Sequence, residues 1–185
     1  MLFKKIKFLF IILLFYQSSV FSKSTSFTQI DAKNLTNYFS GIIAFENKDN
    51  SNALDFFQSS KILISKHEPY LKRYVLSLVL ENKILQATNV VRNNFGEKNT
   101  NFFDAYLLLI FDNLKKKNFK QAKLYIEKAE NFQKNDNFNV AILEILKQYI
   151  FVFQQNKIPV SKKDYGNLSF IAETFQRCYL NDKKT

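Results

Sequence analysis

Three segments of the chain repeat one pattern at a nearly constant interval. In each segment an alanine is followed four positions later by a bulky residue and seven positions later by a smaller one. The alanines are Ala53, Ala87 and Ala122, so the intervals are 34 and 35 residues. A period of this length is typical of stacked helical hairpins, in which each hairpin covers the apolar face of the next. The pattern therefore predicts an all-α protein built from repeated hairpins.

Composition agrees with this prediction. The 185 residues include two prolines and three glycines, and 46% of them are hydrophobic. A β-sandwich or barrel would need many turn residues at short intervals, so these architectures are disfavoured. The apolar content is sufficient for a core, and long segments without breakers favour helices.

Polar clusters and the few breakers divide the chain into eight predicted helices. Pro69 is suited to opening a helix and Gly96 to closing one. The segment 102–114 is apolar on nearly every side, so we expect it to be buried between neighbouring helices. A longer connector, residues 156–164, precedes the last helix. The predicted helices run from Asp31 or Asn34 to Glu46 and then over about residues 52–65, 69–80, 84–95, 102–114, 119–132, 138–154 and 165–180.

The repeated segments resemble the tetratricopeptide repeat (TPR). That family has a small residue in the first helix of each hairpin, and in the second helix an alanine, a bulky residue and a second alanine. The first hairpin matches with Gly41, Ala53, Phe57 and Ser60, the third matches with Ala122, Ile126 and Ala129, and the second departs at Asn94. The resemblance implies a right-handed α-solenoid of about three TPR-like repeats plus two C-terminal helices, over residues 31–181. The small residues would let two helices approach closely.

The resemblance also implies a binding surface, because the first helices of this family line a concave groove. Eight of the nine corresponding residues are apolar or aromatic, and the ninth, Lys72, is available to a carboxylate. They either form a groove for an apolar peptide or helix, or are buried because the superhelix closes on itself. Burial is favoured, since the segment 102–114 is apolar all round. The nine residues are Tyr38, Ile42, Phe45, Lys72, Leu76, Val79, Leu107, Phe111 and Leu114.

Residues 1–22 have the layout of a secretory signal peptide. Lysines precede the apolar run Phe8–Tyr16, and Val20 and Ser22 fit a cleavage site. The run is shorter than the roughly 20 residues of a membrane-spanning helix, although an uncleaved anchor is an alternative. A polar linker, residues 23–30, follows. A leader before such repeats is similar to exported bacterial proteins, so we expect a location in the periplasm or outer envelope.

The chain is basic, with a formal net charge of +11. Its arginines are Arg73, Arg92 and Arg177, so 24 of the 27 basic residues are lysine. Nucleic-acid binding is disfavoured, because bidentate contacts to phosphate and guanine favour arginine. Association with an anionic membrane surface or cell-envelope polymer is the alternative function. An AT-rich genome would also produce many lysines.

Residues for catalysis are few. The single histidine, His67, lies at a predicted helix end, where exposure or a contact with the helix dipole explains it. The single cysteine, Cys178, lies on an apolar helical stripe and is expected to be a buried, inert thiol. No Gly-rich phosphate loop or His/Cys metal motif occurs, so we predict no catalysis, cofactor or metal. The sequence favours an exported scaffold or adaptor that binds protein or peptide segments.

Overall fold

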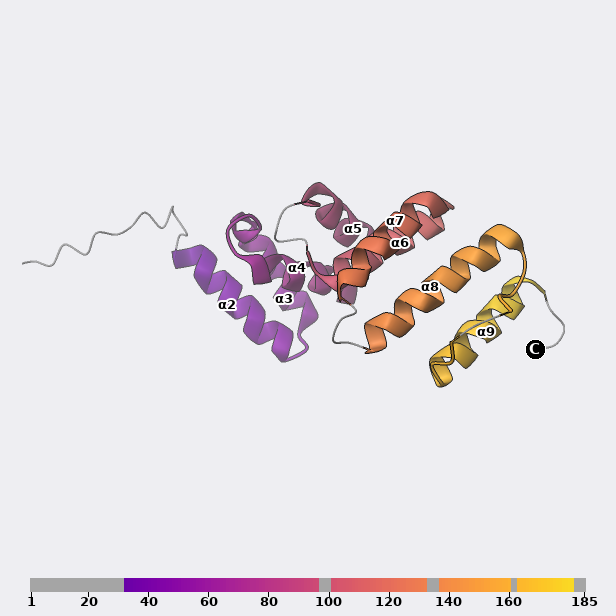
Figure 1. Ribbon diagram of the computed structural model, residues 1–185. Coiled ribbons are helices and arrows are strands. Elements are labelled where there is room, and N and C mark those ends of the chain that lie inside the picture. Colours follow the sequence, from indigo (N-terminus) through magenta and orange to yellow (C-terminus); the bar gives the residue numbers. More distant parts are fainter. Residues whose placement is uncertain (1–31, 97–100, 133–136, 161–162, 182–185) are drawn as a thin grey trace, which may run out of the picture. The chain divides into compact units, whose positions relative to one another are not determined.

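The computed structural model describes residues 32–96, 101–132, 137–160 and 163–181, and from Ala32 onward they belong to one compact unit. These residues form eight α-helices and no β-strand, which confirms the all-α prediction (Figure 1). The predicted leader, 1–22, and linker, 23–30, lie outside the described residues. The helices are α2 (Ala32–Glu46), α3 (Asn50–Ser59), α4 (Glu68–Leu80), α5 (Ile84–Asn93), α6 (Phe103–Lys115), α7 (Phe119–Ala129), α8 (Asn137–Gln155) and α9 (Asn167–Tyr179).

The helix boundaries agree with the prediction to within two residues except at the ends of α3 and α7. Helix α2 begins at Ala32, so Asn34 lies inside it and does not cap it. Helices α3 and α7 end earlier than expected, because each tightens into a short 3₁₀ turn, Lys61–Leu63 and Glu130–Phe132. After α3, the hydroxyl of Ser60 donates to the carbonyl of Phe56 at 3.0 Å and competes with the α-helical hydrogen bonds there.

The three hairpin turns have the same backbone geometry. Lys48, Asn82 and Lys117 each have a positive φ, of 62°, 57° and 56°. The intervals between these three residues along the chain are the same as those between the repeated alanines. The next residue in each turn donates its N–H to a carbonyl five residues earlier, which is the Schellman arrangement that closes a helix. These bonds are Asp49 N to Ala44 O at 2.9 Å, Lys83 N to Leu78 O at 2.8 Å and Asn118 N to Asn113 O at 2.8 Å.

The repeated small residues are where the helices of each hairpin meet. Ala53, Ala87 and Ala122 are fully buried. A β-carbon on Gly41 of α2 would stand 2.8 Å from Cε1 of Phe57 on α3, so the close approach expected of this glycine is confirmed. The bulky residues four positions after the alanines, Phe57, Val91 and Ile126, are also buried.

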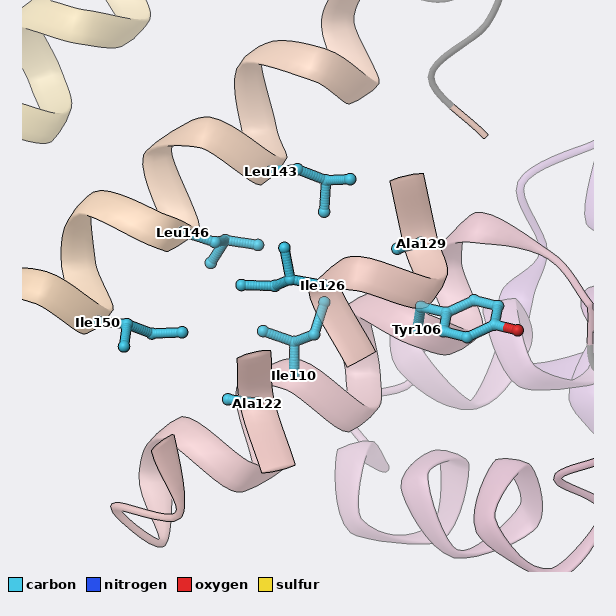
Figure 2. Close-up of a cluster of buried hydrophobic side chains, with 8 residues drawn as sticks. All are labelled: Tyr106, Ile110, Ala122, Ile126, Ala129, Leu143, Leu146 and Ile150. Atoms are coloured by element: carbon cyan, nitrogen blue, oxygen red, sulfur yellow. The ribbon is translucent and has the colours of Figure 1, made fainter. Parts of the chain in front are cut away.

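Successive helices pack in chain order, from α2 against α3 to α8 against α9. One apolar cluster joins α6, α7 and α8. Figure 2 shows Leu143, Leu146 and Ile150 of α8 facing Ile110 of α6 and Ile126 of α7. Because each helix covers part of its neighbour, the core is distributed along the chain. None of the described helices combines the length and apolarity that a membrane crossing needs.

Cys178, His67 and the apolar face of α9 differ from expectation. Cys178 is exposed, so the prediction of a buried thiol is wrong. Helix α9 buries only Ala172 and Gln176, and Ile171, Phe175 and Tyr179 on its apolar stripe are exposed. His67 is half-buried, so plain exposure does not describe it, and its Nε2 shares a hydrogen bond of 2.9 Å with the Tyr38 hydroxyl.

Candidate peptide-binding groove

Two cavities adjoin on α6 and together form one groove. The first cavity has a volume of about 480 Å³ and lies between α4, α5 and α6. The second has a volume of about 590 Å³ and lies between α6, α8 and α9. Phe111 and Lys115 line both. The first is also lined by Val75, Leu76, Val79, Ile84, Leu85, Thr88, Asp104, Leu107, Leu108 and Asp112, and the second by Leu114, Leu146, Tyr149, Phe153, Phe175 and Tyr179.

The structure brings together five of the nine predicted groove residues. Leu76 and Val79 of α4 and Leu107, Phe111 and Leu114 of α6 line these cavities. The other four lie elsewhere. On α2, Tyr38 is buried and Ile42 and Phe45 are half-buried, whereas Lys72 of α4 is exposed.

The nine groove residues were expected to be buried, and this expectation is wrong for those on α4 and α6. Leu76, Val79, Leu107 and Leu114 are half-buried, and Phe111 is 52% exposed. Helix α6 packs chiefly on α5 and α7, so its face toward the cavities is not covered. Uniform apolarity along α6 therefore reflects two surfaces, one in the core and one lining the groove.

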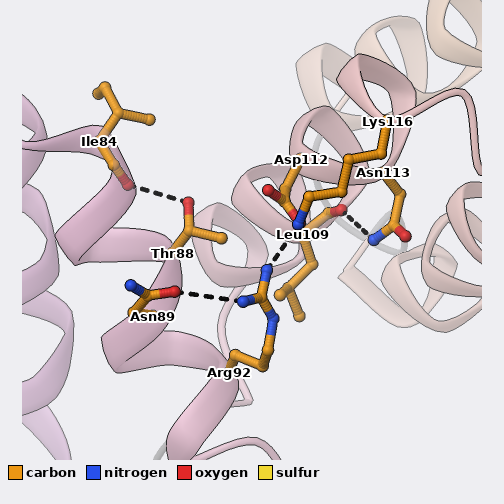
Figure 3. Close-up of polar contacts among 8 residues, drawn as sticks. All are labelled: Ile84, Thr88, Asn89, Arg92, Leu109, Asp112, Asn113 and Lys116. Atoms are coloured by element: carbon orange, nitrogen blue, oxygen red, sulfur yellow. Dashed lines mark hydrogen bonds and ion pairs between the residues drawn. The ribbon is translucent and has the colours of Figure 1, made fainter.

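The acidic residues of the first cavity are neutralised by this chain's own cations. Asp112 Oδ2 lies 2.7 Å from Arg92 Nη2 of α5 and 2.8 Å from Lys116 Nζ. Figure 3 shows the side chains of Arg92, Asp112 and Lys116 converging. Asp104 Oδ2 lies 3.6 Å from Lys72 Nζ. Lys72 is therefore engaged within the molecule, contrary to the expectation that it is available to a carboxylate.

Lys115 differs from these cations. Its exposed side chain lines both cavities but forms no hydrogen bond or ion pair with another residue that the structure describes. In the second cavity, burial raises the pKa of Tyr149, so its hydroxyl is neutral at physiological pH. The groove thus combines apolar walls with one positive charge where its two parts meet.

Sequence reasoning missed the walls contributed by α5, α8 and α9. Leu85 of α5 is 70% exposed and lies outside the buried stripe of Ala87 and Val91. Its apolar character at a position outside that stripe could have identified it from the sequence as a surface residue of the groove. Phe175 of α9 is 64% exposed. Its exposure could not be predicted, because it lies on the apolar stripe of α9 that was expected to face the core.

The described residues contain no group of three or more His, Cys, Asp and Glu side chains able to hold a metal ion. Comparisons with protein-family models, with curated proteins and with solved structures found no match to this chain.

Proposed function

We propose that this protein is an exported scaffold or adaptor, a right-handed TPR-like α-solenoid that binds a segment of a partner protein in the groove. The repeated turns at Lys48, Asn82 and Lys117 and the buried alanines support the solenoid. The layout of residues 1–22 supports export.

The proposal that the groove binds a partner is based on apolar side chains that are exposed around the two adjoining cavities. Leu85, Phe111 and Phe175 are each more than half exposed on three different helices. Contiguous exposed apolar surface marks interaction sites in soluble proteins. An elongated groove between helices suits an amphipathic segment that places successive apolar side chains in successive cavities.

A photocrosslinking experiment tests this proposal. Phe111 is replaced by the photoreactive amino acid benzoylphenylalanine in the native envelope, and Phe170 is replaced in the same way as the control. Phe170 is 76% exposed on α9 and lines neither cavity. We expect position 111 to crosslink to a discrete polypeptide, identified by mass spectrometry, and position 170 not to do so. Equal crosslinking from the two positions would contradict a specific groove.

Salt concentration separates this function from association with an anionic surface. Contacts of exposed lysines weaken as ionic strength rises, because the Debye length falls from about 10 Å at 0.1 M to about 3 Å at 1 M salt. Burial of apolar groups persists under these conditions. Crosslinks from position 111 that survive high salt support the groove, and their complete loss favours the surface model.

A further inference from the structure

We infer that the segment bound in the groove is acidic and amphipathic, with a carboxylate at Lys115 between apolar side chains in the two cavities. This inference rests on the proposed function and specifies the chemistry of the partner. The observation behind it is the position of Lys115, a cation that pairs with none of the described residues, where two apolar cavities meet.

The groove's charges are already balanced everywhere except at Lys115. Asp112 is held between Arg92 and Lys116, and Asp104 is paired with Lys72. A cationic segment would therefore find no acceptor that lacks a partner along the first cavity. The ammonium of Lys115, by contrast, can form a charge-assisted hydrogen bond with a carboxylate of the segment.

The position of Lys115 on α6 also sets where that carboxylate must lie. Lys115 follows Phe111 by four residues, so the two side chains share one face of α6. Both line both cavities. A segment that fills the two cavities must therefore pass Lys115, and an acidic residue between its apolar anchors meets the ammonium there.

The charge of the whole chain acts in the same direction. The formal net charge is +11, and a strongly basic protein attracts acidic partners and repels basic ones during encounter. That long-range attraction is not specific to the groove. The pairing at Lys115 is specific, and this difference can be measured.

The probes are fluorescein-labelled synthetic helical peptides, with apolar residues at i, i+3, i+4 and i+7 chosen from Leu, Ile and Phe. Each peptide is made with glutamate, glutamine or lysine at its remaining flanking positions. Fluorescence anisotropy gives the affinity for the wild-type protein, for Lys115→Gln and for Lys120→Gln. The last variant removes the same charge from an exposed site on α7 that lines neither cavity.

We expect the glutamate peptides to bind the wild-type protein and Lys120→Gln about two- to fivefold more tightly than the glutamine peptides, the size of effect that an exposed charge pair produces. In Lys115→Gln this preference should shrink to the smaller one that the net charge of the chain produces by itself. A preference as large in Lys115→Gln as in Lys120→Gln would overturn the inference, since other lysines would then cause it.

Two further results separate the inference from the proposed function. If glutamate and glutamine peptides bind equally well and Phe111→Glu abolishes both, the groove binds segments without the acidic preference, and only the inference fails. If no peptide of the series binds the wild-type protein better than it binds Phe111→Glu, both the inference and the proposed function fail.

Discussion

Gly41 of α2 lies directly against the ring of Phe57 of α3. An added β-carbon would stand 2.8 Å from Cε1 and 2.9 Å from Cδ1 of that ring. The ring is fully buried, with the rings of Tyr38 and Tyr70 at centroid distances of 6.1 and 6.0 Å. Neighbours on these sides restrict its movement, so only a residue without a side chain fits at position 41.

Gly41→Ala should therefore destabilise the protein. Overpacking of this kind costs about 1–3 kcal/mol, which exceeds or offsets the roughly 1 kcal/mol that alanine gains over glycine in a helix. Urea denaturation would measure the loss. In a Phe57→Leu background the clash is removed, so the same Gly41→Ala change should become neutral or stabilising. Equal destabilisation in both backgrounds would contradict the contact.

The turn between α6 and α7 offers the opposite prediction, a stabilising change. Lys117 has a φ of 56°, which a lysine adopts only at a cost, whereas glycine adopts it readily. Lys117→Gly should raise the unfolding free energy by about 0.5–1 kcal/mol. Lys123→Gly, inside α7, should lower it by about 1 kcal/mol. Loss of stability in both variants would contradict the described turn.

Stability should also depend on pH through His67. Its Nε2 is 2.9 Å from the Tyr38 hydroxyl, to which Arg73 Nη1 donates at 3.2 Å. Burial, and then the positive charge of Arg73, lower the pKa of His67 below its ordinary value of 6.5. Below that value the unfolded chain therefore binds more protons than the folded protein. The contribution of neutral His67 is complete above about pH 6.5 and is lost as the pH falls toward and through the lowered folded-state pKa.

Urea denaturation of the wild-type protein and of His67→Gln between about pH 7.5 and about pH 5 measures this effect, because the two proteins share every other titrating group. The wild-type protein should lose stability across the range, and His67→Gln should lose less. Identical pH profiles for the two proteins would exclude a role for His67.

The sequence predicted the hairpins well because their determinants are local. Ala53, Ala87 and Ala122 recur at the repeat interval, and the polar turns between helices are visible as short clusters. It was harder to predict which apolar side chains remain exposed. The pattern of α6 shows that Phe111 is apolar, but only the packing of α6 on α5 and α7 shows that no helix covers it.

The composition of the groove was predicted only in part for the same reason. A resemblance to one repeat family pointed to the first helix of each hairpin, and Leu76 and Leu107 do line the groove. The contributions of Leu85 and Phe175 depend on how neighbouring hairpins are set against one another. The pairing of Lys72 with Asp104 likewise joins two hairpins, and no local pattern reports it.

One ion pair, Arg92–Asp112, joins α5 to α6 beside the first cavity. The side chain of Asp112 is only 14% exposed and also contacts Lys116, so Asp112→Ala removes the acceptor of Lys116 and leaves Arg92 with Asn89 alone. This change should cost about 1–2 kcal/mol of unfolding free energy. Asp104→Ala is the matched control, because its pair with Lys72 is longer and more exposed and should contribute at most about 0.5 kcal/mol.

The salt dependence of stability tests the ion pair of Asp112 in a second way. Raising the ionic strength to about 1 M should reduce the difference in stability between the wild-type protein and Asp112→Ala, without abolishing it, because this carboxylate is largely shielded from solvent. If Asp104→Ala costs as much as Asp112→Ala in urea denaturation, the ion pairs of α5 and α6 have no special role in holding the first cavity. A larger cost for Asp112→Ala would instead show that Arg92 fixes α5 against α6, and peptide affinity should fall with it.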